Sequence, residues 1–256
     1  MFKILLIGDS CEDVYHYGYC DRLSPEAPVP VLKHHSTEKR EGMCLNVRNN
    51  LNAFGVKIEV LTNKKKIKKE RFVDLKTKQH LLRTDFGESK KLKPFTNAQL
   101  NKFNFEKLDA IIVSDYNKGF ITTNNIKFII SKAKNAKIPV FVDSKKNNLS
   151  EFENCIIKIN RLENSKVKKF PNNYELIITC GENGAIWNNN TFSIQACDVF
   201  DVCGAGDTFL AGLALRYLET KSFEKSITFA NNCSRIAVQK FGTYTLTKKD
   251  INDLRI

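Results

Sequence analysis

The chain has 256 residues, 42% of them hydrophobic, which is enough to bury the core of one large domain. Its 41 Lys and Arg residues exceed its 28 Asp and Glu residues, and the net charge of +13 favours anionic ligands such as nucleotides and phosphorylated sugars. No nucleic-acid-binding motif accompanies this charge, and no apolar run is long enough for a signal peptide or a membrane span. We therefore expect a cytoplasmic protein with no nucleic-acid or membrane partner, whose eight cysteines, which form no C-x-x-C pair, are free thiols.

Short apolar runs bounded by turn residues predict strands that are buried on both faces. In chain order they are KILLIG (3–8), IEVLT (58–62), AIIVSD (110–115), PVFVDS (139–144), CIIKIN (155–160) and LIITCG (176–181). Helices are predicted over 124–134 and 222–240, and from about Asp207 in DVCGAGDTFLAGLALRYL (201–218). This alternation predicts an α/β fold, with a mostly parallel central sheet and helices on both of its faces. No repeat or linker divides residues 1–256, so we expect a single domain.

Two segments interrupt the alternation. In SPEAPVPVLKHH, Pro25, Pro28 and Pro30 exclude a central strand, so the region around 15–35 is interpreted as an edge strand or a small β flap. The lysine-rich run KKKIKK (64–69) is typical of a solvated loop or face.

Polar residues and a glycine gather where the predicted strands stop. Asp9, Asp115, Asp143, Asn160 and Gly181 all follow or end an apolar run. Ligands of open parallel sheets bind outside the carboxyl ends of the strands, so the sequence predicts the functional site at this edge.

The stretch GAGD (204–207) places small residues and an acid at the start of a predicted helix. Unpaired amides and the helix dipole attract an anion at this position, and small residues let the backbone approach it closely. A carboxylate beside an anion is unfavourable unless it handles a proton or a metal, as the general base of a phosphoryl transfer does. The alternative is that Asp207 only caps the helix.

DVCGAGDTFLAG resembles the C-terminal signature of the ribokinase-like (PfkB) carbohydrate kinases, and further matches extend over nearly the whole chain. A more specific resemblance is to the kinase domain of bacterial D-glycero-β-D-manno-heptose 7-phosphate kinases. It is carried by GDSCEDVYHYG (8–18), RLSPEAPVPVL (22–32), QHLLRTDF (79–86), VSDYNKGFIT (113–122) and KFGTYTLT (240–247). The resemblance implies a ribokinase-like fold with a lid, and transfer of the ATP γ-phosphate to O1 of a heptose 7-phosphate.

The resemblance also implies roles for individual residues. Asp207 matches the catalytic base, and Gly204, Ala205 and Gly206 match its anion hole. Asn160 and Glu163 match the N-x-x-E element that organises Mg²⁺ through water, although a helix cap explains the same pair.

The nucleotide would lie against Thr179, Gly181 and Gly184, in a segment that can equally be a hairpin turn.

Four residues match positions near the sugar. Asp13 matches the carboxylate that holds sugar hydroxyls, with an exposed loop acid as the alternative. Gly42 and Asn46 match the paired-glycine segment and the asparagine that follows it. Lys145 is a candidate phosphate contact or a surface charge.

The chain departs from the family pattern at two places. Met43 replaces the second of two adjacent glycines, and its side chain is expected to narrow or reshape the acceptor pocket. A strand and a helix are expected to be missing between Gly55 and Arg71. Another sugar acceptor and a degenerate, non-catalytic nucleotide-binding member therefore remain as alternatives. The resemblance further implies a homodimer, and we expect no nucleotidyltransferase domain.

Overall fold

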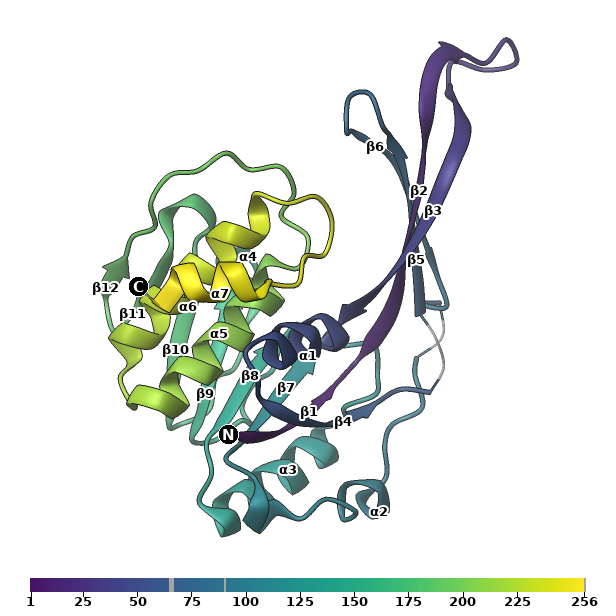
Figure 1. The fold of residues 1–256 in the computed structure, drawn as a ribbon. Coiled ribbons are helices and arrows are strands. Elements are labelled where there is room, and N and C mark those ends of the chain that lie inside the picture. Colours follow the sequence, from purple (N-terminus) through teal and green to yellow (C-terminus); the bar gives the residue numbers. More distant parts are fainter. Residues whose placement is uncertain (65–66, 90, 256) are drawn as a thin grey trace.

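In the computed structural model, residues 1–64, 67–89 and 91–255 are described, and they form two sheets of unequal size. The larger sheet has eight strands in the order β12-β11-β10-β9-β8-β7-β1-β4 (Figure 1). Its strands are β1 (Lys3–Gly8), β4 (Lys57–Thr62), β7 (Ala110–Asp115), β8 (Val140–Ser144), β9 (Cys155–Asn160), β10 (Tyr174–Thr179), β11 (Ala185–Trp187) and β12 (Asn190–Phe192). The six strands from β4 to β10 in this order are parallel, and β11 and β12 continue the sheet as antiparallel strands.

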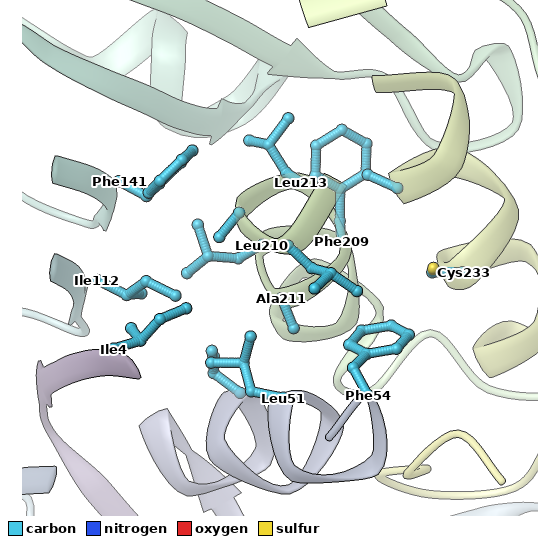
Figure 2. Close-up of a cluster of buried hydrophobic side chains, with 14 of the residues drawn as sticks. Ile4, Leu51, Phe54, Ile112, Phe141, Phe209, Leu210, Ala211, Leu213 and Cys233 are labelled. Atoms are coloured by element: carbon cyan, nitrogen blue, oxygen red, sulfur yellow. The ribbon is translucent and has the colours of Figure 1, made fainter. Parts of the chain in front are cut away.

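Both faces of this sheet are buried, as continuous apolar strands require. In β1, Ile4 and Leu6 belong to one hydrophobic cluster, whereas Leu5 and Ile7 belong to a second cluster on the other face. The helices α1 (Cys44–Ala53), α5 (Ala205–Thr220), α6 (Phe223–Val238) and α7 (Lys248–Arg255) cover the first face. Figure 2 shows α1 and α5 packing their apolar side chains against Ile4, Ile112 and Phe141. The predicted α/β fold is therefore confirmed.

The second face is covered by α3 (Thr123–Ala136), with α2 (Asn97–Leu100) and the short 3₁₀ helix η1 (Phe105–Lys107) beside it. Capping boxes explain why two of the helices start where they do, because the side chains of Thr96 and Thr122 accept hydrogen bonds from amides in the first turns of α2 and α3. Two shorter elements, α4 (Arg161–Lys166) and the 3₁₀ helix η2 (Gly181–Asn183), follow β9 and β10.

The second sheet stands away from the first as a lid (Figure 1). It contains β2 (Ser10–Leu23), β3 (Pro30–Met43), β5 (Ile67–Asp74) and β6 (His80–Phe86), in the order β3-β2-β5-β6. The lid is thus larger than the flap predicted around 15–35. Pro25 and Pro28 lie in the turn between β2 and β3, and Pro30 begins the edge strand β3, whereas β2 is a central strand.

Three further expectations are corrected or confirmed. Helix α5 begins at Ala205, two residues before Asp207. The lysine-rich run is not wholly a solvated loop, because Ile67 is buried and begins β5, while positions 65 and 66 lie outside the described residues. All eight cysteines are free thiols, as predicted. No helix in the part of the chain that the structure describes is long and apolar enough to cross a membrane.

Candidate active site

The first turn of α5 lies at the carboxyl ends of the central strands. Gly204 precedes the helix in a left-handed conformation with a φ of 79°, and a Cβ there would lie 2.5 Å from Asn46 Nδ2, so only glycine fits. Asp207 is only 4% exposed. Its side chain does not cap the helix, since Gly204 is the N-cap residue and provides no side-chain bond. The capping alternative for Asp207 is therefore not what the structure shows.

Two donors hold the Asp207 carboxylate. The Tyr116 hydroxyl donates to Oδ1 at 2.7 Å, and Asn46 Nδ2 donates to Oδ2 at 3.2 Å and to the Gly204 carbonyl at 3.3 Å. Tyr116 directly follows β7, and Asn46 lies in α1. Two side chains from outside α5 thus fix this carboxylate, with one protein donor on each oxygen.

The environment of Asp207 makes it an unusual acid. The pKa of Asp207 is raised to about 6, mainly by burial. The Tyr116 hydrogen bond lowers the pKa, whereas the negative charge of Asp143 raises it. The Asn46 hydrogen bond and the charge of Lys158 lower the pKa again by smaller amounts. A carboxyl group that titrates close to neutral pH can accept a proton and release it again, which is the property of a general base.

Lys158 is a second buried charge beside the same turn. It lies in β9, only 3% exposed, and its Nζ donates to Asp143 Oδ2 at 2.6 Å. A Cβ at Gly206 would come within 2.9 Å of this Nζ, so the ammonium group lies directly against the helix start. Burial alone would lower the pKa of Lys158, but Asp143 raises it above the ordinary value, so the lysine stays charged.

The backbone around Gly204, Ala205 and Gly206 has donors for an anion. The Thr208 amide makes the helical bond to the Gly204 carbonyl at 3.0 Å, and the Ala205 amide bonds weakly to the Val202 carbonyl at 3.3 Å. The amides of Gly206 and Asp207 precede the first helical bond and are left without a partner inside the helix. They lie next to the Lys158 ammonium and can therefore bind an anion together with it.

A cavity of about 250 Å³ adjoins this turn. Four residues predicted for the nucleotide or its metal line it, together with residues from β9, α5, α6 and the segment after β12: Lys158, Asn160, Thr179, Gly181, Gly184, Ile194, Ala205, Gly206, Phe209, Asn231 and Ser234. A Cβ at Gly181 would meet nothing within 4 Å, which leaves space for a ligand, whereas a Cβ at Gly184 would collide with the Phe192 carbonyl of β12. Gly184 is thus required by the predicted hairpin as well as lining the cavity.

Asn160 and Glu163 form the helix cap that was the alternative to a metal site. Asn160 Oδ1 accepts from the Glu163 amide at 2.8 Å, and Glu163 Oε2 accepts from the Asn160 amide at 2.9 Å. Within 1–64, 67–89 and 91–255, no three His, Cys, Asp or Glu side chains are grouped to hold a metal. The cap leaves Glu163 Oε1 for a hydrated ion, which fits Mg²⁺ because that ion usually keeps several waters and one or two carboxylates.

Two of the residues predicted for the sugar, Asp13 and Gly42, lie in the lid strands β2 and β3. Asp13 in β2 is 2% exposed and forms an ion pair with Arg71 of β5, which the sequence did not indicate. Asp13 also closely faces Gly42, where a Cβ would collide with its carboxylate. Asp13 is therefore not an exposed loop acid. A ligand that reaches Asp13 would also meet the guanidinium group of Arg71.

Met43 does not enter the site. Its side chain is 4% exposed and packs in the hydrophobic cluster that includes Cys11, Leu61 and Ile67. The expectation that Met43 narrows the acceptor pocket is wrong in this structure, because the β3–α1 junction turns its side chain into the core. The backbone nevertheless keeps a glycine-like conformation, with φ 57° and ψ −133°, which costs a non-glycine residue on the order of 1–3 kcal/mol.

Lys145 is exposed, but it lies beside Tyr116, the residue that contacts Asp207. Its Nζ is 4.3 Å from the centre of the Tyr116 ring, and Lys69 Nζ approaches the same ring at 5.9 Å. Lys145, Tyr116 and Asp207 are thus linked by direct contacts.

Sequence reasoning missed Tyr116, Lys158 and Arg71. Lys158 carried a signal, because a lysine inside the apolar run CIIKIN must be buried and paired. Tyr116 and Arg71 carried none, since their partners are 91 and 58 residues away in the chain.

The fold and this site define a sugar kinase of the pfkB type. Residues 46–250 match the pfkB family carbohydrate kinases, so the chain belongs to that family of phosphotransferases with an alcohol acceptor. Among curated relatives, it is 31% identical to the bifunctional protein HldE of a Nitratiruptor species, over 98% of this chain and 64% of the relative. It is 32% identical to HldE of Pasteurella multocida, over 98% of this chain and 63% of that protein. The chain therefore spans slightly less than two thirds of these relatives.

Solved structures share the fold at low sequence identity. Phosphofructokinase-2 from Escherichia coli in complex with potassium superposes with a TM-score of 0.75 at 15% identity, covering 99% of this chain and 98% of that chain. Ribokinase of Arabidopsis thaliana complexed with ribose and ATP has a TM-score of 0.69 at 15% identity, covering 99% of both chains. These neighbours confirm the predicted ribokinase-like fold.

Proposed function

We propose that this carbohydrate kinase transfers the γ-phosphoryl group of ATP to a hydroxyl of a phosphorylated sugar, and specifically to O1 of D-glycero-D-manno-heptose 7-phosphate. The observation that carries the phosphoryl transfer is the buried Asp207 carboxylate, which is held by Tyr116 and Asn46 and lies beside a cluster of anion-binding groups. The heptose acceptor is supported by the specific sequence motifs and by HldE relatives at 31% and 32% identity.

In the proposed reaction Asp207 takes the proton of the acceptor hydroxyl. The acceptor oxygen forms a bond to the γ-phosphorus while the bond from that phosphorus to the β–γ bridging oxygen breaks, and ADP leaves. The amides of Gly206 and Asp207 and the Lys158 ammonium face the charge that spreads over the moving group. A general base typically contributes 10²–10⁴-fold to the rate, so Asp207 carries about that share.

The nucleotide is assigned to the cavity lined by Thr179, Gly181 and Gly184. Its volume of about 250 Å³ holds part of a nucleotide, and the open space at Gly181 extends it toward solvent. Mg²⁺, held through water near Glu163 and Asn160, would neutralise charge on the β- and γ-phosphates.

The sugar is assigned to the space between the lid and the start of α5, against Asp13, Gly42 and Asn46, with Lys145 as the contact to its phosphate. A carboxylate suits a diol because it accepts two hydrogen bonds. Asp13 is paired with Arg71, however, so the acceptor meets a zwitterionic pair rather than a lone acid. The pair repels an anionic acceptor less than a lone carboxylate would, because Arg71 offsets the charge of Asp13. This observation keeps a sugar phosphate other than the heptose as the second candidate.

A homodimer formed through the lid is part of the proposal. The strands β3 and β6 are the edges of the lid sheet, and Leu82 and Phe86 of β6 are 56% and 53% exposed. Edge strands with exposed apolar residues are usually covered by a partner. Light scattering on the wild type and on Leu82→Lys/Phe86→Lys tests this, and a monomeric mass for the wild type would contradict it.

The test of the function is ATP turnover with Mg²⁺ against heptose 7-phosphate, other sugar 6- and 7-phosphates and free sugars, with Asp207→Asn as the control. Turnover on the heptose phosphate that is lost in the variant supports the acceptor and the base together. Turnover on another phosphorylated sugar selects the second candidate. ATP binding without turnover on any acceptor would indicate a degenerate, non-catalytic member and overturn the proposal.

A further inference from the structure

The segment that follows β7 is held in place by two buried carboxylates. Asp9, which is fully buried at the end of β1, accepts the Tyr116 amide at 2.8 Å and the Lys118 amide at 3.4 Å through Oδ2. Asp115 Oδ1 accepts the amide of Asn117, whose backbone has a φ of 58°. These bonds tie the turn to the sheet, so the backbone of Tyr116 is fixed independently of its side chain.

The Tyr116 ring is fixed as well. Lys145 lies over it at 4.3 Å and Lys69 approaches at 5.9 Å, from β8's end and from the lid strand β5. Cations over the face of a tyrosine ring attract it and limit its movement. The hydroxyl at the far end of the ring then reaches Asp207 Oδ1 at 2.7 Å, which is a short distance suited to a charge-assisted bond.

We propose that Tyr116 is a positioning residue of the phosphoryl transfer, whose hydroxyl aims the Asp207 carboxylate and keeps it ionised so that it can accept the acceptor's proton. The inference rests on the proposed role of Asp207 as the base. It is specific to the hydroxyl, because phenylalanine would keep the ring between its two lysines and lose only the donor.

The other groups around Asp207 do not replace this donor. Burial raises the pKa of Asp207 to about 6, and Asp143 adds to the effect, while Asn46 and the charge of Lys158 act against it more weakly than Tyr116 does. The charge of Asp207 also acts on two thiols, Cys11 of β2 and Cys44 of α1. Because burial raises the pKa of each thiol, both stay neutral near pH 7. Without the Tyr116 hydroxyl, the carboxyl would be protonated at a higher pH.

The experiment compares Tyr116→Phe with Tyr244→Phe, a matched control that also removes a tyrosine hydroxyl bonded to an aspartate, Asp250, at 2.8 Å. The first measurement is ¹³C NMR titration of aspartate carboxyl groups in the free protein, with Asp207→Asn to assign the resonance. The second is the pH dependence of kcat. In Tyr116→Phe we expect the Asp207 midpoint to rise by about 1, because one lost charge-assisted bond changes the titration by that order.

The same variant should lose roughly tenfold in kcat at pH values below the shifted midpoint, recover much of it at pH 8.5, and keep its KM for the acceptor. Tyr244→Phe should leave both midpoints unchanged. Equal Asp207 midpoints in wild type and Tyr116→Phe would overturn the inference, as would a variant whose kcat equals that of the wild type at pH 6.

Two arrangements keep the test decisive. If no acceptor is phosphorylated, the proposed function fails, while the NMR titration still decides whether the Tyr116 hydroxyl controls Asp207. If Tyr116→Phe does not fold, 3,5-difluorotyrosine at position 116 keeps the ring and makes the hydroxyl a stronger donor. The Asp207 midpoint should then fall, and an unchanged or higher midpoint would overturn the inference.

Discussion

Replacing Asp207 by asparagine should abolish turnover and remove a loss of stability that the wild type undergoes as pH rises toward neutral. The carboxyl pKa is raised from 3.8 to about 6 in the folded chain, mainly by burial, so the folded state binds more protons than the unfolded state between these two values. The protonated carboxyl does not oppose folding, so the free energy of unfolding is unaffected by this group below about pH 4. As pH rises from there through about 6, the carboxyl must ionise inside the protein, and stability is lost. Asparagine has no such loss.

The size of the effect follows from the difference in pKa. Each pH unit of difference corresponds to about 1.4 kcal/mol, so the advantage of Asp207→Asn over the wild type should grow by at most about 3 kcal/mol between pH 4 and pH 8. Asparagine can still accept from Tyr116, but its own amide would face the donating amide of Asn46, which lowers the stability of the variant equally at all pH values. The change with pH is thus the quantity to measure.

Urea unfolding of both proteins at pH 4.5, 5.5, 6.5 and 7.5 measures this change. Asp250→Asn serves as the control of opposite sign. Although burial opposes it, the hydrogen bonds from Thr247 and Tyr244 lower the pKa of Asp250, so its contribution is lost only as pH falls toward the acid range. Asp250→Asn should be less stable than the wild type by a constant amount over pH 5.5–7.5. A stability difference for Asp207→Asn that does not increase with pH would refute the account of this buried charge.

Three more outcomes are expected. Lys158→Met should lower kcat by about 10²–10³-fold, because a fixed charge facing the moving group is lost, and a change in KM alone would contradict its proposed place. Glu163→Gln should raise the Mg²⁺ concentration needed for half-maximal rate, which a Mg²⁺ titration measures. The control Thr122→Ala, in the capping box of α3, should lower the melting temperature and leave the Mg²⁺ requirement unchanged. Gly242→Ala should loosen the lid, because Gly242 has a φ of 73° and the new methyl group would lie 2.5 Å from Arg40 Nη1 in β3. Limited proteolysis of the lid should then be faster, and an unchanged rate would contradict the prediction.

The central sheet could be predicted because its signal is local. Runs such as KILLIG and AIIVSD contain four consecutive apolar residues, as a strand covered on both faces requires. The observed strands begin and end within two residues of those predicted. Helix α3 was equally readable. The start of α5 was placed two residues late, because Gly204 with its left-handed conformation, and not the acid, precedes the helix.

The lid was only partly predictable. Its strands β5 and β6 mix charged and apolar residues, and β5 pairs with β2, which is far away in the chain. Register between such strands depends on contacts such as Asp13 with Arg71, which no local pattern reveals. The prolines indicated extended structure correctly but not that two of them form the tip of a hairpin.

The residues of the site also differ in whether a local sequence pattern reveals them. Asp207 and the small residues before it were found because a helix start has a recognisable chemistry. Tyr116, which contacts Asp207, comes from a different strand end, and the distance between them in the chain hides the pair. Met43 shows the reverse case, since the residue type suggested a side chain in the pocket, whereas the turn of the backbone directs it into the core.

The most direct test of the central claim is ³¹P NMR of the product formed from ATP, Mg²⁺ and heptose 7-phosphate. The account predicts a second sugar phosphate resonance, coupled to the anomeric proton, which forms with the wild type and is absent with Asp207→Asn. Release of free phosphate without a new sugar phosphate, or formation of the same product by the Asp207→Asn variant at the wild-type rate, would contradict it.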